Sequence, residues 1–295
     1  MRHHKNATQA PHMDTSPQPS GRFYRAVVFP PVRAVLGFFW VGGAIGLGAG
    51  GASLLPEHLQ ALAPLLLALG AVLGYYTFVR VVERRPVTEL WSAGWLLEAV
   101  AGMAIGVALF STVIGILYLL GSYTATVAAS TAGVMPALTA AVMAGVTEEL
   151  LIRAVAFRIL ESWLGSWIAL AISAILFGVL HLPNPEATAL SSAAIALEAG
   201  VMLAAAYMVT RRVWLAIGIH MAWNFTQSGI FGAPTSGVPS PGFLEGQLHG
   251  SALLSGGSFG PEASIVAVTV CLALGLYFLR MAHARGHILK PAWRQ

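Results

Sequence analysis

Residues 97–120 read LEAVAGMAIGVALFSTVIGILYLL, a run in which Glu98, near its start, is the only charged side chain. A helix rises about 1.5 Å per residue, so about 20 apolar residues cross the roughly 30 Å hydrocarbon core of a bilayer. The run therefore predicts a membrane-spanning helix. Similar apolar runs predict seven further spans, at residues 34–55, 59–82, 132–157, 164–182, 190–210, 213–231 and 263–281.

The composition of the whole chain favours the same fold class, an all-α polytopic membrane bundle of about eight transmembrane helices. Of its 295 residues, 57% are hydrophobic and only 9% are charged. Soluble domains carry about 25% charged residues. So few charged groups cannot cover a water-exposed surface, which excludes an ordinary soluble domain.

The positions of lysine and arginine predict the topology. These residues fall before the first predicted span and at or after the ends of the second, fourth, sixth and eighth, and only Arg153 lies well inside a span. The intervening loops contain neither residue type, at residues 56–58, 121–131, 183–189 and 232–262. Cytoplasmic loops retain positive charge, so we predict that both ends of the chain are cytoplasmic. The basic isoelectric point of 9.5 then reflects topology, and no nucleic-acid partner is expected.

The chain is predicted to contain one transmembrane domain. The predicted parts are a disordered cytoplasmic tail at residues 1–30, a helical domain at 31–282 with its catalytic core at 132–231, and a cytoplasmic tail at 283–295. Within the first span, Gly42, Gly46 and Gly50 recur every four residues. This spacing lets another helix approach closely, and we interpret it as a packing stripe.

Ionisable side chains inside the predicted spans point to function. A charge within the bilayer costs several kcal/mol unless it faces the bundle interior or water. Glu148 and Glu149 are adjacent in the fourth span, and Arg153 follows Glu149 by four residues, on the same helical face. One arginine cannot neutralise two carboxylates. An ion pair that locks helix packing would explain one glutamate and leave the other without a partner.

Two histidines accompany these acids. Phe177 and His181 share a helical face in the fifth span, as do His220 and Asn224 in the seventh. A lone buried histidine is usually a packing residue. Two of them, with a glutamate pair and an asparagine, supply the groups that activate water and stabilise an oxyanion.

Other chemistries of intramembrane proteolysis lack their residues in this sequence. A diaspartyl protease needs two aspartates, and the chain has only Asp14. The zinc motif His-Glu-x-x-His and a serine in a Gly-x-Ser-Gly setting are both absent from the sequence. A glutamate–histidine apparatus remains.

Three motifs in order carry a family resemblance: Glu148-Glu149-x-x-x-Arg153, Phe177-x-x-x-His181 and His220-x-x-x-Asn224. They resemble those of the CAAX-protease and bacteriocin-processing family (CPBP or Abi family), which includes the Ras-converting CAAX prenyl protease. The resemblance covers roughly residues 132–231 and implies an intramembrane endopeptidase.

The resemblance also implies roles for individual residues. It implies that Glu148 and His181 activate the attacking water, and that His220 and Asn224 hold the oxyanion of the tetrahedral intermediate. It further implies that Glu149 and Arg153 orient the site and that Phe177 packs beside it.

The motifs allow this mechanism either with or without a bound metal ion. Members of the family are often described as metalloproteases, and Glu148, His181 and His220 could supply three ligands of an open zinc site. The positive charge of Arg153 would compete with a cation. We therefore expect metal-free hydrolysis with no required cofactor, with zinc as the alternative.

The predicted depths of these residues disagree. Counted from the cytoplasmic ends of their spans, Glu148 and His220 are about 10 and 7 residues deep, or ~15 and ~11 Å, whereas His181 is about 17 residues deep, or ~26 Å. Side chains at such different depths cannot meet. We expect either that the fifth helix begins below the surface, with residues 159–167 along the interface, or that the span boundaries are wrong.

The alternative function is a transporter or an ion or proton channel. Glu148, Glu149 and the histidines suit a proton relay equally well on physical grounds. The inverted repeats or paired broken helices that would support it are not visible in the sequence. Glu198 lies alone in the sixth span, and its membership in the site stays open.

For the protease, the predicted partners are the lipid bilayer and a membrane-associated peptide or protein, such as a prenylated or leader peptide. The predicted location is the cell membrane, as a multi-pass protein.

Overall fold

The computed structural model describes residues 29–294, so nearly all of the predicted tail at residues 1–30 lies outside the described residues. Within the described part the chain is mostly helical. Five helical segments are long and apolar enough to cross a membrane: Pro30–Ala52, Glu57–Glu83, Trp95–Leu119, Ala189–Thr210 and Ile265–Ala284. Each overlaps one of the predicted spans, which confirms a helical membrane protein.

These five segments contain several helical elements. They are α2 (Pro30–Ala52), η1 (Glu57–Leu62), α3 (Ala63–Phe78), η2 (Val79–Glu83), α4 (Trp95–Leu119), α8 (Ala189–Ile195), η4 (Ala196–Gly200), α9 (Val201–Thr210) and α12 (Ile265–Ala284). Of these, η2 and η4 are wider π-helical turns. Short helices outside them are α11 (Ala252–Ser255), η6 (Pro261–Ala263) and η7 (Ala292–Arg294).

The other three predicted spans are also helical, although shorter or interrupted by π-helical turns. The fourth comprises α5 (Val134–Glu149), the π-helical η3 (Leu150–Phe157) and α6 (Arg158–Leu164). The fifth is α7 (Ser166–Leu180), and the seventh is α10 (Trp214–Phe225) with the π-helical η5 (Thr226–Ile230). π-helical turns occur frequently at functional sites.

The predicted end of the fourth helix at residue 157 was wrong. Residues 158–164 continue that helix, and Gly165, with φ +77°, separates it from α7. Glu148 therefore lies sixteen residues before Leu164, and His181 lies fifteen residues after Ser166. With this boundary the two residues lie at similar distances along their helices from the turn at Gly165, which removes the depth disagreement.

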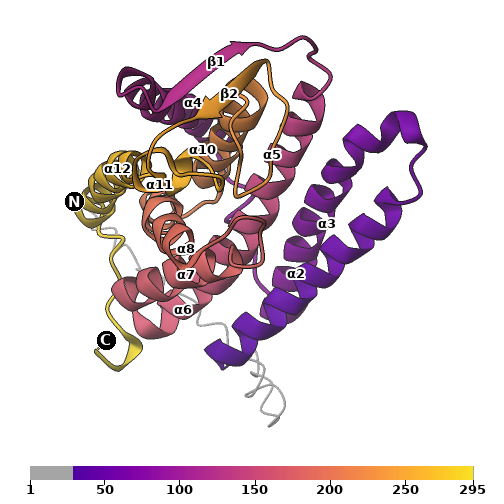
Figure 1. Ribbon diagram of the computed structural model, residues 1–295. Coiled ribbons are helices and arrows are strands. Elements are labelled where there is room, and N and C mark those ends of the chain that lie inside the picture. Colours follow the sequence, from indigo (N-terminus) through magenta and orange to yellow (C-terminus); the bar gives the residue numbers. More distant parts are fainter. Residues whose placement is uncertain (1–28, 295) are drawn as a thin grey trace, which may run out of the picture.

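Two strands depart from the all-α prediction. β1 (Tyr123–Val127) and β2 (Leu244–Leu248) form an antiparallel pair in which Tyr123 lies opposite Leu248. The β1 sequence YTATV is rich in β-branched residues, which favour strands. The pair joins the two loops at 121–131 and 232–262, and it lies at the end of the bundle opposite the carboxyl terminus (Figure 1).

Close contact between α4 and α10 fixes the position of the seventh span. A Cβ on Gly106 of α4 would lie 2.4 Å from the carbonyl oxygen of Ile219, next to His220, so only glycine permits this approach. The predicted packing stripe at Gly42, Gly46 and Gly50 was wrong, because nothing lies within 4 Å of where their Cβ atoms would be. α2 packs on α3 through other glycines, and this hairpin forms one flank of the bundle (Figure 1).

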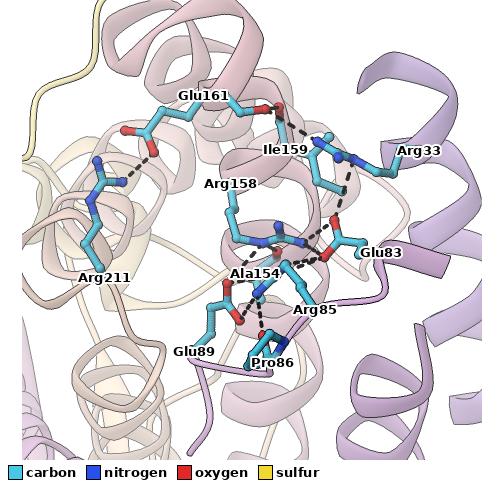
Figure 2. A network of polar contacts seen from close by, with 11 residues as sticks. Arg33, Glu83, Arg85, Pro86, Glu89, Ala154, Arg158, Ile159, Glu161 and Arg211 are labelled. Carbon is cyan, nitrogen blue, oxygen red and sulfur yellow. Dashed lines mark hydrogen bonds and ion pairs between the residues drawn. The ribbon is translucent and has the colours of Figure 1, made fainter. Parts of the chain in front are cut away.

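Arginines and glutamates form an ion-pair network at one end of the bundle (Figure 2). Glu83 at the end of η2 lies 2.8 Å from Arg158, 2.9 Å from Arg85 and 3.5 Å from Arg33. Glu161 of α6 pairs with Arg211 after α9. Arg158 and Glu161 of α6 pair with residues that are distant in the sequence, Glu83 and Arg211. From the sequence alone, the polar residues of α6 therefore looked like part of a loop.

We predict that Glu83→Gln lowers the thermal unfolding midpoint in detergent by several degrees. The Glu83 side chain is only 2% exposed. Its loss leaves Arg33, Arg85 and Arg158 with one remaining carboxylate in this part of the network, that of Glu89. Breaking such a pair costs about 1–3 kcal/mol, less than a fully buried pair because the arginines are partly exposed. Glu57→Gln, at an exposed position, is the control. Equal midpoints for the two variants would contradict a structural role for the network.

Candidate active site

Side chains from three helices meet at one cavity of about 280 Å³. Glu148 lies at the end of α5, His181 follows α7, and His220 and Asn224 lie on α10. All four line this cavity, together with small residues of α5 and Ser236 from the loop that precedes α12. The structure therefore brings together the four residues predicted to be catalytic.

Glu149 connects two helices beneath the cavity. Its Oε1 lies 2.8 Å from a guanidinium nitrogen of Arg153 and 2.9 Å from Nδ1 of His220. Both the Glu149 and the Arg153 side chains are fully buried. With Nδ1–H donated to the carboxylate, the Nε2 atom of His220 is the ring nitrogen left for other contacts, and it lies 3.9 Å from Oε2 of Glu148.

Arg153 extends this connection to the sixth span. A second guanidinium nitrogen donates to the carbonyl oxygens of Ala199, at 3.0 Å, and Gly200, at 3.3 Å. Both carbonyls belong to the π-helical turn η4, where the regular helical ladder is disturbed. The arginine thus holds η4 against the fourth span.

Phe177 packs between the charged groups. The Arg153 guanidinium lies 4.5 Å from the centroid of the Phe177 ring, within the range of a cation–π contact. The ring centroids of His181 and His220 lie 4.8 and 6.0 Å from that of Phe177. Nδ1 of His181 donates to the Phe177 carbonyl oxygen at 2.8 Å, which leaves its Nε2 for the cavity.

Glu148 differs from Glu149 in its surroundings. Its side chain is 34% exposed, and its Oε2 has no hydrogen-bond partner among the described residues. It also lines a second opening of about 170 Å³ between η3 and the end of α7. A carboxylate oxygen without a hydrogen-bond partner at a cavity wall can accept a proton from a water molecule that reaches it.

Two residues of the long loop 232–262 border the site and were not predicted. Ser236 and Glu262 line a smaller cavity together with Glu198. The loop 232–262 was interpreted as a connection rich in glycine, proline and serine. The sequence offered one indication that this loop contributes to the site, the position of Glu262 directly before an apolar span.

Glu148, His181 and His220, the residues considered as zinc ligands, all line the larger cavity. Among residues 29–294, no three His, Cys, Asp or Glu side chains are grouped closely enough to hold a metal ion. Nδ1 of both His181 and His220 is already engaged, by a carbonyl and by Glu149.

We predict that Glu262 makes stability depend on pH. Burial raises the pKa of its carboxyl group to about 7, from an ordinary value of 4.5. The folded state therefore binds this proton more tightly than the unfolded chain, so stability falls as pH rises from about 4.5 to 7 and then levels off. Glu262→Gln removes this contribution and flattens the unfolding midpoint over that window. Glu245→Gln, at an exposed position, should keep the wild-type slope, and identical slopes in all three proteins would refute the assignment.

Comparison with known families supports the arrangement. Residues 130–226 match the family model described as type II CAAX prenyl endopeptidase Rce1-like, which describes a family of proteases. No curated protein and no solved structure matched the chain. The matched segment contains all three motifs and nearly coincides with the predicted core at 132–231. The match covers about a third of the chain, and over this segment it confirms the resemblance to the CAAX-protease and bacteriocin-processing family that the motifs carry.

Proposed function

We propose that the protein is an intramembrane endopeptidase that hydrolyses a peptide bond with a water molecule activated by glutamate and histidine. One observation carries the proposal: Glu148, His181, His220 and Asn224, from three helices, line one cavity within an apolar bundle.

Glu148 serves as the general base in this proposal. Its unpartnered Oε2 accepts a proton from the attacking water, and Nε2 of His181, on the same cavity wall, helps to orient that water. The water oxygen bonds to the carbonyl carbon of the substrate, and the proton then passes to the leaving amine. No covalent enzyme intermediate is required.

His220 and Asn224 hold the oxyanion of the tetrahedral intermediate. Because Nδ1 of His220 donates to Glu149, donation from Nε2 to the oxyanion requires the protonated ring. The Glu149 carboxylate offsets that positive charge, while Arg153 and Phe177 keep the carboxylate and ring in position. Hydrogen-bond donors fixed in a site that excludes water stabilise such an anion strongly.

The proposed reaction is metal-free. The positive charge of Arg153, which would compete with a cation, supports this choice over zinc.

We further propose eight spans in one transmembrane domain, residues 31–282, with both termini cytoplasmic in the cell membrane. The basic network of Figure 2 and the β1–β2 pair lie at opposite ends of the bundle, which supports this topology. The substrate is a membrane-associated peptide, of the prenylated or leader class.

Cleavage of a quenched fluorescent peptide library by purified protein in detergent tests this function. We expect Glu148→Ala and His181→Ala each to lower kcat/KM by at least about 10²-fold, since each removes a group that acts on the proton in transit. The wild-type rate should survive a strong chelator.

His58→Ala and Glu186→Ala, at exposed positions, are the matched controls and should cleave like the wild type. Loss of activity upon chelation, restored by added zinc, would overturn the metal-free mechanism. Absence of cleavage, with ion or proton flux in liposomes that changes in the same variants, would replace the protease with a transporter.

A further inference from the structure

A smaller cavity of about 30 Å³ lies behind the catalytic side chains. It shares His181, His220 and Asn224 with the larger cavity, so these side chains separate the two spaces. Its other polar lining comes from Glu198 and Glu262, with Ser236 shared by both spaces. We call it the rear chamber.

Glu198 faces the rear chamber with an unsatisfied atom. The side chain is 1% exposed, and its Oε2 has no hydrogen-bond partner among the described residues. Its other oxygen, Oε1, lies 3.7 Å from the Cys271 sulfur, a weak donor. Arg153 is nearby in the fold, but the hydrogen bonds it donates go to Glu149 and to backbone carbonyls.

Glu262 enters the chamber from the loop. Its Oε1 accepts from the backbone N–H and the hydroxyl of Ser236, which fixes the carboxyl group in place. No arginine or lysine belongs to the described lining of the chamber. Two buried carboxyl groups thus face a small space whose described lining contains no arginine or lysine.

The size and polarity of the chamber define its occupant. A cavity holds a water molecule when it offers about 10–15 Å³ and two to four polar partners. The rear chamber exceeds this volume, is too small for an amino-acid side chain, and offers Glu198, Glu262, Ser236 and Asn224. Buried polar atoms are rarely left without a partner, and water would satisfy Oε2 of Glu198.

We infer that Glu198 and Glu262 hold one or two water molecules in the rear chamber and that this chamber supplies the water consumed by the reaction; the inference rests on the proposed function. Each cleavage consumes one water, whose oxygen joins the new carboxyl group and whose protons are shared between the two products. A peptide in the larger cavity blocks access from that side. His181, His220 and Asn224 border both the chamber and the larger cavity, so water in the chamber lies beside three of the proposed catalytic side chains.

Arg153 links the chamber to the catalytic histidine. Its bonds to Ala199 and Gly200 hold the π-helical turn that presents Glu198, and its bond to Glu149 holds the carboxylate that orients His220. Glu198 is therefore a positioning residue, which acts on the nucleophile through water.

Two substitutions that introduce side chains of similar length distinguish a water-binding role of Glu198 from a packing role. Glu198→Gln keeps groups that hydrogen-bond to water, whereas Glu198→Met fills the same space with an apolar chain. We expect the Gln variant to keep kcat within about threefold, and the Met variant to lose at least about tenfold in kcat with KM unchanged. Leu197→Met, at the adjacent partly exposed position, is the control and should match the wild type.

Equal kcat for the Gln and Met variants would overturn the inference, as would a loss that appears only in KM. If Glu198→Met fails to fold, the same pair of substitutions at Glu262 decides by the same criteria. An experimental map that resolves waters gives an independent test that needs no activity. Ordered water between Glu198 and Glu262 is expected in the wild type, and an empty chamber would refute the proposal even if the protein cleaves no peptide.

Discussion

The carboxylate of Glu149 is the interaction on which the site depends. One of its oxygens binds both Arg153 and His220, and Arg153 in turn binds the carbonyls of Ala199 and Gly200. Three spans, the fourth, sixth and seventh, are thereby tied to one buried anion. A carboxylate buried in this way is tolerated only because its charge is paired and hydrogen-bonded. The same contacts that compensate the charge also set the orientation of the His220 ring.

The π-helical turns explain how regular helices can supply these contacts. η3, η4 and η5 each lie within a span that borders the site, directly after Glu149, around Glu198 and directly after α10. A regular helix uses its carbonyls in its own ladder. At η4 the disturbed ladder lets Ala199 and Gly200 accept from Arg153, so the local irregularity of one helix satisfies the guanidinium of another.

The sequence predicts the spans and the local pairs because both depend on short-range spacing. Apolar runs of fixed length give the helices, and four-residue spacing gives the pairing of Glu149 with Arg153 and the shared face of Phe177 and His181. The errors concern partners that are distant in sequence. Arg158 looked like a loop residue because its partner Glu83 comes from another span, and the only sign from Glu262 was its position directly before an apolar span. The glycine stripe in α2 failed for the same reason, since spacing says that a helix can approach but not which one does.

The two adjacent glutamates illustrate how one helix separates two roles for the same side chain. A rotation of about 100° per residue directs Glu149 to Arg153 and His220, where it is fully buried, and leaves Glu148 beside the cavity with a free oxygen. A base needs an unoccupied acceptor and access to water, and an orienting group needs the opposite, because its value lies in bonds that do not change. Oε2 of Glu149 also has no hydrogen-bond partner among the described residues, so its complete burial and the two bonds on Oε1 are what distinguish it from Glu148. These different surroundings are why we propose Glu148, rather than Glu149, as the group that transfers the proton.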